Sequence, residues 1–369
     1  MRILLLASDT KYALNFRGDL LKQMVDLGHE VYAVVLDRVY EKQFNNIGVK
    51  LIDISFKRTN INPFSDIAII KKYINIFKQY KPDLIYAFTA KPVVYGCIAA
   101  GICKITEVYP LLPGLGYIFG RSGIKGKTIE LIVKKLYKYS LSKAKKVFFQ
   151  NNDDIEFFTS NKILLKEKCI NVNGSGVNME RYKQTSTPEK TSFLMVSRLL
   201  KNKGVIEYLN AAKVLKKKYP DIVFRLIGGF DTNPNSLNMD DIKPYIDNEI
   251  IDYKGYIEDV RPYINDCMVF VLPTYYNEGL PRTILESMAV GRAVITTAWK
   301  GGKDAVVDGE TGFLIPIKNK DILIEKMEWM INNPDKAADM GIKGNLRCRK
   351  LYDVNKVNNS ILKAMNLIK

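Results

Sequence analysis

The chain has 369 residues, of which 47% are hydrophobic and 26% are charged. This length suits two domains, and the apolar content is enough for a core in each, which excludes a disordered chain. Lysine and arginine number 56 against 39 acidic residues, giving a formal net charge of +17. Such a balance predicts anionic partners: phosphorylated small molecules, an anionic membrane face or nucleic acid.

The cysteines and the single histidine, His29, argue against a metal site, a disulfide framework and a Ser/His/Asp catalytic triad. The five cysteines are scattered and form no Cys-x-x-Cys pair. We therefore expect reduced thiols, no metal ion and no cofactor. The apolar start is short and becomes polar at Asp9, unlike a signal peptide, and no run of about 18 apolar residues is present. A cytoplasmic protein without a membrane span is expected.

Strand and helix patterns alternate along the first half of the chain. The predicted strands are 2–8, 29–35, 49–54, 84–88 and 147–150, and the predicted helices are 18–27, 66–79 and 93–101. This alternation predicts a doubly wound parallel sheet, an α/β fold.

A second α/β series follows a polar stretch at 186–190, which predicts an interdomain linker. Its predicted strands are 192–196, 223–227, 251–253, 269–273 and 293–296, and its predicted helices are 205–219, 283–290, 322–331 and 335–352. We expect one domain at 1–185, a second at 190–350, and a C-terminal helix at 351–369 that packs back on the first domain. Ligands of such sheets bind at the carboxyl ends of the strands.

Residues 273–291 give the clearest indication of a binding site, because an apolar strand there leads through a loop into a helix. The first turn of that helix has free backbone N–H groups near residues 280–283, which attract phosphate. Glu278 lies in the loop and Glu286 lies inside the helix. One carboxylate is placed to meet sugar hydroxyls and the other to meet ribose hydroxyls.

These residues resemble the signature of the retaining glycosyltransferases of family 4. That family has the GT-B fold, in which two doubly wound Rossmann-like domains face a central cleft. Residues 197–204 are similar to the family's strand–loop segment, and residues 301–304 and 308–314 are similar to its glycine-rich turn and following strand. The resemblance extends over essentially the whole chain.

The resemblance implies an acceptor-binding first domain and a second domain that binds a nucleotide sugar. Glu278, Arg198 and Lys203 are then the catalytic residues, with the two cations on the donor diphosphate. The expected donor-binding residues are Gly279, Leu280, Pro281, Arg282, Thr283, Glu286 and Gly18. Because the sequence contains no Asp-x-Asp motif, cations and a helix terminus replace a metal ion in stabilising the leaving group.

One subgroup of this family builds O-antigens, capsules and lipid-linked glycans on polyprenyl diphosphate. A resemblance to this subgroup indicates the acceptor. Residues 15–18, at the predicted first loop, and residues 58–64 and 89–92 are similar to that subgroup. The resemblance implies transfer of an N-acetylhexosamine from a UDP-sugar, with Arg17, Arg58 and Lys91 as candidate contacts to acceptor phosphate. The glycine-rich stretch 113–119 lacks the histidine found there in several family members.

Residues 125–146 predict a basic amphipathic helix. The apolar positions recur near helical spacing, at Ile129, Ile132, Val133, Leu136, Tyr137 and Leu141, among many lysines. Such a helix can lie on anionic lipid, which indicates a peripheral protein at the inner face of the plasma membrane. The alternative is a core-packed helix with a solvated face.

Two other classes of function stay open. A GT-B-fold UDP-sugar epimerase shares the architecture but needs acid and base groups in its cleft, and His29 is badly placed for that role. A nucleic-acid-binding protein explains the charge, but the basic residues lack the aromatic interleaving of a known module.

Overall fold

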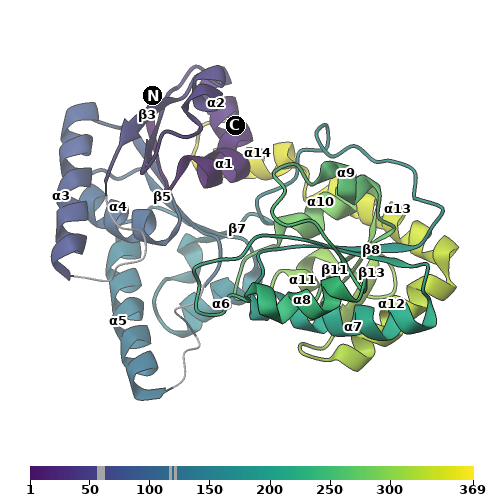
Figure 1. Cartoon of the computed structure of the whole chain (residues 1–369). Coiled ribbons are helices and arrows are strands. Elements are labelled where there is room, and N and C mark those ends of the chain that lie inside the picture. Colours follow the sequence, from purple (N-terminus) through teal and green to yellow (C-terminus); the bar gives the residue numbers. More distant parts are fainter. Residues whose placement is uncertain (56–62, 116–118, 120–122) are drawn as a thin grey trace. The chain divides into compact units, whose positions relative to one another are not determined.

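The computed structural model describes residues 1–55, 63–115, 119 and 123–369. The chain divides into two compact units (Figure 1). Unit 1 comprises Met1–Ser175 and Asn355–Lys369, and unit 2 comprises Gly176–Val354. Each unit contains one parallel sheet with helices on both faces, so the predicted α/β fold class is confirmed.

The sheet of unit 1 has the order β3-β2-β1-β4-β5-β6-β7. Its strands are β1 Arg2–Leu6, β2 Glu30–Val35, β3 Lys50–Asp53, β4 Leu84–Phe88, β5 Val108–Leu112, β6 Val147–Phe149 and β7 Cys169–Asn171. Successive side chains of a strand point to opposite faces. In β1, Leu4 and Leu6 therefore join one apolar cluster, and Ile3 and Leu5 join the other.

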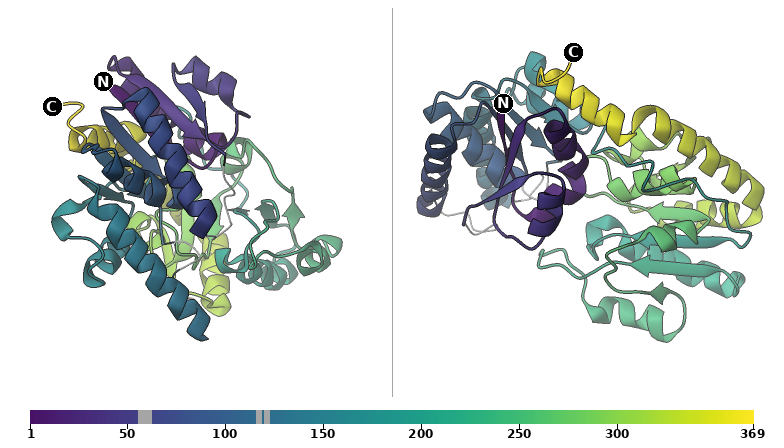
Figure 2. Two further views of the ribbon diagram at one scale, coloured as in Figure 1. Left: turned by 90° about the vertical axis from the view of Figure 1, so that its left-hand side faces the viewer. Right: turned by 90° about the horizontal axis from the view of Figure 1, so that it is seen from above.

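Two layers of helices cover these faces. One layer contains α3 Pro63–Tyr80, α4 Ala90–Ile102, α5 Gly123–Ser142 and α6 Asn152–Ser160. The other contains α1 Thr10–Asp26, α2 Glu41–Asn46 and the C-terminal helix α14 Val354–Ala364. The chain thus returns to unit 1 at its end (Figure 2). Ile361 and Leu362 of α14 are buried in the same cluster as α1.

The first βα connection differs from the prediction. The expected loop at residues 15–18 is wrong, because α1 already begins at Thr10 and contains these residues. Asp9 starts the helix by accepting a hydrogen bond from the backbone N–H of Tyr12, at 2.7 Å. Ala13, Arg17 and Leu20 then continue one buried helical face.

Unit 2 has the sheet order β10-β9-β8-β11-β12-β13. Its strands are β8 Ser192–Val196, β9 Val223–Ile227, β10 Asp252–Tyr253, β11 Val269–Leu272, β12 Ala293–Thr297 and β13 Gly312–Ile315. Its helices are α7 Val205–Lys218, α8 Met239–Asp247, α9 Arg261–Asn265, α10 Arg282–Val290, α11 Gly302–Ala305, α12 Lys320–Asn332 and α13 Pro334–Leu351. Helix α7 packs on α12 and α10 packs on α13, with the sheet between the two pairs (Figure 1).

The polar stretch 186–190 lies inside unit 2, where a buried arginine holds its beginning. Arg292 is fully buried, and its guanidinium donates to the hydroxyl of Thr185 and, at 3.0 Å, to the carbonyl of Ser186. Burial lowers the pKa of Arg292, and these acceptors compensate the buried donors. The connection between the units therefore lies earlier in the chain, at Ser175 and Gly176.

Candidate active site

The carboxyl edge of the unit 2 sheet brings several loops into close contact. A Cβ added to Gly204, which follows β8, would lie 2.3 Å from the carbonyl oxygen of Pro273, which follows β11. A Cβ added to Gly301, which follows β12, would lie 1.9 Å from the carbonyl oxygen of Gly279. Both glycines also have positive φ values, +79° and +73°. Glycine at these two positions therefore lets three loops converge on one site.

Lys203 and Glu278 form an ion pair at the centre of these loops. The Lys203 ammonium donates to Oε1 of Glu278, and the two side chains are 10% and 22% exposed. The ammonium also lies 5.4 Å from the centre of the Tyr276 ring. Thr274 supports the same carboxylate, with its hydroxyl 3.5 Å from Oε1. The predicted catalytic residues Lys203 and Glu278 are thus brought together.

Arg198 reaches the same ring from the end of β8. Its guanidinium carbon lies 5.7 Å from the centre of the Tyr276 ring, and its Nη1 donates to Oδ2 of Asp231 at 2.7 Å. Partial burial alone would raise the pKa of Asp231, but hydrogen bonds from Arg198 and the backbone of Asn233 outweigh it and lower that pKa. Two cations therefore flank one aromatic ring, which is an arrangement suited to a diphosphate.

Helix α10 begins immediately beside these residues. Pro281 precedes its first turn and makes no side-chain capping bond, so the N–H groups of that turn lack the usual side-chain acceptor. The predicted helix start at residue 283 is one residue late, because Arg282 is already helical. The segment Gly279, Leu280, Pro281, Arg282 and Thr283 thus forms the loop end and first turn, as a phosphate-binding helix terminus requires.

Glu286 lies one turn into α10 and is only 7% exposed. Its Oε1 is 3.0 Å from Nε of Arg282. Burial raises the pKa of Glu286, while Arg282, Tyr182 and Arg181 act in the opposite direction.

Sequence reasoning missed Asp231, Tyr276 and Tyr182. Asp231 follows β9 and Tyr276 follows β11, and polar or aromatic residues just after a strand were the available signal. Tyr182 lies in the segment before β8, far from α10 in sequence, so no local pattern pointed to it.

The predicted acceptor residues lie in unit 1. Arg17 is 1% exposed, with its guanidinium carbon 5.1 Å from the centre of the Phe88 ring at the end of β4. Lys91, in the first turn of α4, lies 3.3 Å from Asp66. Arg17 and Lys91 therefore share one end of β4, whereas Arg58 lies outside the described residues. Gly18 is inside α1, so the loop on which its predicted role depended does not form.

Unit 1 contributes a polar pair that the sequence did not indicate. The hydroxyl oxygens of Ser8 and Thr89 lie 2.6 Å apart, at the ends of β1 and β4. The strand order reverses between these two strands, and doubly wound sheets bind ligands at such a point.

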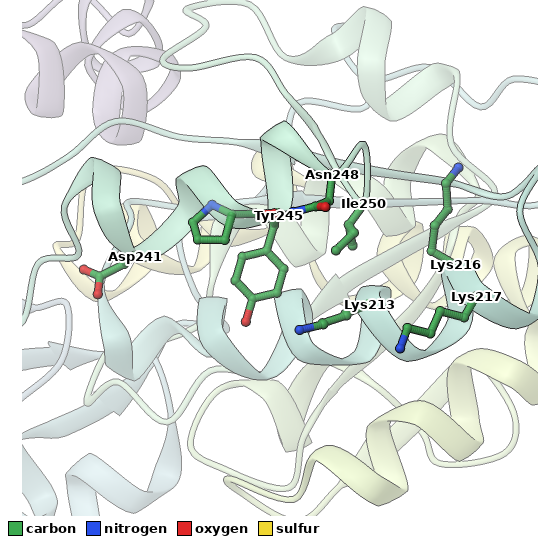
Figure 3. A pocket seen from close by; sticks show the side chains of 8 residues that line it. Lys213, Lys216, Lys217, Asp241, Tyr245, Asn248 and Ile250 are labelled. Carbon is green, nitrogen blue, oxygen red and sulfur yellow. Dashed lines mark hydrogen bonds between the residues drawn. The ribbon is translucent and has the colours of Figure 1, made fainter.

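A separate pocket of about 570 Å³ lies between α7 and α8 (Figure 3). It is lined by Lys213, Lys216, Lys217, Asp241, Pro244, Tyr245, Asn248 and Ile250. Its polar groups serve the fold: Lys216 donates to the carbonyl of Ile222 at 3.0 Å, and the Tyr245 hydroxyl donates to Asn210 at 2.9 Å. It borders the last turns of α7, the end away from Lys203, so we assign it no part in the active site.

Within the described residues, His, Cys, Asp and Glu side chains form no group of three or more that could hold a metal ion. Metal independence stays a prediction for an activity assay.

Family models identify the class of protein. A model described as glycosyl transferases group 1 matches residues 178–347, and a glycosyl transferase 4-like model matches residues 2–151. Together they cover the main part of both units. The chain is therefore a glycosyltransferase of the family 4-like group with the GT-B fold, as its signature residues predicted.

The curated relatives that match nearly the whole chain include two bacterial transferases. One is the N,N'-diacetylbacillosaminyl-diphospho-undecaprenol alpha-1,3-N-acetylgalactosaminyltransferase of Campylobacter jejuni, 27% identical over 350 residues, which are 90% of each chain. The other is the capsular polysaccharide biosynthesis glycosyltransferase CapM of Staphylococcus aureus. It is 27% identical over 346 residues, which are 88% of this chain and 86% of the relative.

Solved structures agree with the fold. Anabaena HepE, in complex with UDP and glucose, has a TM-score of 0.80 with 19% identity, and the match covers 100% of both chains. A glycosyltransferase from Rickettsia africae has the same TM-score and identity and covers 100% of this chain and 98% of its own. At this identity the likeness shows the architecture alone.

The convergence of the loops can be tested by replacing each of two glycines that have the same φ angle with alanine. Gly301 and Gly309 both have a φ of +73°, but an added Cβ meets nothing within 4 Å at Gly309. We expect Gly309→Ala to cost about 1 kcal/mol of unfolding free energy, from backbone strain alone. Gly301→Ala should cost about 2 kcal/mol more, because the Cβ overlaps Gly279. Urea unfolding measures both, and equal losses would contradict the close approach.

Proposed function

We propose that this glycosyltransferase moves an N-acetylhexosamine from a UDP-sugar, with retention, to a polyprenyl-diphosphate-linked saccharide in bacterial surface-glycan assembly. The proposed donor site is supported mainly by the largely buried Lys203–Glu278 pair beside the first turn of α10. In this proposal unit 2 binds the donor and unit 1 binds the acceptor. Retention and the UDP donor are supported by the family 4 signature.

The residues have separate roles in the transfer. The bond between the sugar's anomeric carbon and the diphosphate oxygen breaks, the acceptor hydroxyl oxygen forms the new glycosidic bond and its proton passes to the departing diphosphate oxygen, and UDP leaves. Negative charge then grows on the diphosphate, where Arg198, Lys203 and the N–H groups at the start of α10 stabilise it. This cationic set takes the place that a metal ion fills in other transferases. Gly279 allows the sugar to approach the loop closely, and Glu278 accepts hydrogen bonds from sugar hydroxyls.

Lys203 and Glu278 hold each other until the donor arrives. Two charges this buried need compensation, which each supplies to the other in the free enzyme. A bound diphosphate gives Lys203 a new anionic partner, and sugar hydroxyls give Glu278 new donors. The pair is thus exchanged for ligand contacts without leaving a buried charge unpaired.

The acceptor half of the proposal is supported by the curated relatives. The name of the Campylobacter jejuni relative specifies a diphospho-undecaprenol acceptor and an N-acetylgalactosamine donor sugar, and its match covers 90% of both chains. Lys91 and Arg17 at the end of β4 are our candidates for the acceptor phosphates, near the Ser8–Thr89 pair. Arg58 remains a candidate from the sequence.

Turnover of the wild-type enzyme tests the reaction. UDP release is measured with UDP-GalNAc, UDP-GlcNAc, UDP-galactose and UDP-glucose, in EDTA, with and without a polyprenyl-diphosphate-linked mono- or disaccharide. Acceptor-dependent release from one N-acetylhexosamine donor is the expected result. Donor isomerisation without release would replace the proposal with the epimerase. Activity that EDTA abolishes would contradict the metal-free stabilisation of the leaving group.

Glu278→Ala should abolish acceptor-dependent turnover, with kcat reduced at least about 100-fold, because the donor sugar loses its carboxylate partner. The matched control is Glu325→Gln on the exposed surface of α12, where the carboxylate pairs only with its neighbour Lys326 among the bonds described. The control should keep full activity. Near-wild-type turnover of a folded Glu278→Ala enzyme would remove Glu278 from the mechanism.

We also propose that unit 1 docks on anionic lipid through α5. The predicted single apolar face is only partly right, because Tyr137 and Leu141 are buried in the core. Leu131, Ile132 and Tyr139 are instead 55%, 60% and 55% exposed. Exposed lysines surround them: Lys127, Lys135, Lys138 and Lys143. Exposed apolar side chains with basic neighbours suit an anionic bilayer surface. Among the described helices, none is long and apolar enough to cross a bilayer.

The double variant Leu131→Ser/Ile132→Ser should reduce sedimentation with phosphatidylglycerol-containing vesicles at least about tenfold, since it removes the apolar part of the surface. Ile342→Ser/Leu346→Ser is the matched control, because these side chains on α13 of unit 2 are 48% and 62% exposed. The control should sediment like the wild type. Equal binding by all three proteins would exclude α5 as the docking helix.

A further inference from the structure

Two cations of unit 2 lie over the ring of Tyr276. The Arg198 guanidinium carbon is 5.7 Å from the centre of the ring, and Nζ of Lys203 is 5.4 Å from it. Both contacts fall within about 6 Å, the range in which the negative face of an aromatic ring attracts a cation. One side chain therefore attracts both of the cations that the proposed function places on the donor diphosphate.

The backbone around Tyr276 fixes the place of the ring. Its N–H donates to the hydroxyl oxygen of Thr274 at 3.2 Å, and its carbonyl accepts from the N–H of Glu278 at 2.8 Å. The buried Thr274 hydroxyl donates in turn to the carbonyl of Asn202 at 3.3 Å, one residue before Lys203. The loop after β11, which carries the ring, is therefore joined to the loop after β8, which carries the cations.

Each cation also has a carboxylate partner. Nη1 of Arg198 donates to Oδ2 of Asp231 at 2.7 Å, and the Lys203 ammonium donates to Glu278. The two carboxylates come from different loops, after β9 and after β11, and each of these two bonds holds a single cation. The ring of Tyr276, by contrast, is shared by both cations.

A shared ring opposes the repulsion between two neighbouring cations. Like charges repel each other, and more strongly where bulk water is partly excluded. Attraction of both cations to one ring counters this repulsion and favours a single spacing between them, whereas an aliphatic side chain fills the same space without that attraction. A diphosphate presents two anionic groups joined through one bridging oxygen. A preset spacing of two cations therefore suits a diphosphate better than a single phosphate.

We propose that Tyr276 is a positioning residue for the donor diphosphate: its ring holds Arg198 and Lys203 at the spacing at which each cation meets one of the two phosphates. This inference rests on the proposed UDP-sugar donor. A purely structural role, in which the ring only fills space between the loops, is the alternative. The two roles differ in what the ligand must carry, because the spacing of two cations matters for two phosphates and not for one.

The test compares Tyr276→Leu and Tyr276→Phe with the wild-type enzyme by calorimetric titration of UDP and UMP. Tyr276→Leu should weaken UDP binding about tenfold, the effect of losing two cation–π contacts at a partly exposed site, and should weaken UMP binding much less. Tyr276→Phe keeps the aromatic face and should bind both nucleotides like the wild type. Pentafluorophenylalanine at position 276 has a ring of similar size whose face no longer attracts cations, so it should reproduce the losses of the leucine variant.

The matched control is Tyr219→Leu at the end of α7. It removes a tyrosine ring whose centre lies 5.5 Å from Nζ of one cation, Lys218, away from the active site. Both nucleotide affinities should stay unchanged in this variant. A loss confined to the changes at position 276 would then be due to that ring and not to the removal of a tyrosine–cation contact in general.

Three results would overturn the inference. Equal losses for UDP and UMP would show a structural role, and an unchanged UDP affinity of Tyr276→Leu would show no role. A loss for Tyr276→Phe as large as that for Tyr276→Leu would show that the hydroxyl matters and not the aromatic face. In each case the wild type still binds UDP, so the proposed donor would stand. A wild-type enzyme that binds no uridine nucleotide would overturn the proposed donor and this inference together.

Discussion

The ion pair between Lys203 and Glu278 is the interaction on which the site depends. It connects the loop after β8 to the loop after β11, and both side chains are largely buried. Their approach requires the backbones around them to meet at contact distance, which Gly204 and Gly301 permit. Arg198, Tyr276 and the start of α10 then surround the pair. A substitution that separates these loops would therefore displace the cations, the carboxylate and the helix terminus together.

The sequence predicted strands best where apolar residues follow one another without interruption. Strands β4, β8 and β9 were predicted at their observed bounds, because uninterrupted apolar runs mark buried parallel strands. Strand β5 was missed, since Pro110 lies within it and proline disfavours an interior strand. The three-residue strand β7 is too short to show a period.

Site residues that belong to one local sequence pattern could be predicted. Site residues that interact with segments distant in sequence could not. Glu278, Gly279 and Arg282 belong to a single strand–loop–helix segment, which the sequence displays directly. Tyr182 lowers the pKa of Glu286 from a segment about 100 residues earlier in the chain, so no local pattern indicated it. On α1, a family analogy indicated a loop around Gly18, but the Asp9 cap and the buried face starting at Ala13 make a helix there.

The affinity of UDP for Glu278→Gln tests the central claim most directly, because UDP carries the diphosphate but no sugar. If Glu278 occupies Lys203 only until a diphosphate replaces it, neutralising the carboxylate leaves the cation free for its ligand. Calorimetric titration should then give a UDP affinity equal to or higher than that of the wild type. A loss of tenfold or more, in a variant that unfolds at the wild-type temperature, would show that Glu278 supports nucleotide binding itself and would contradict the exchange.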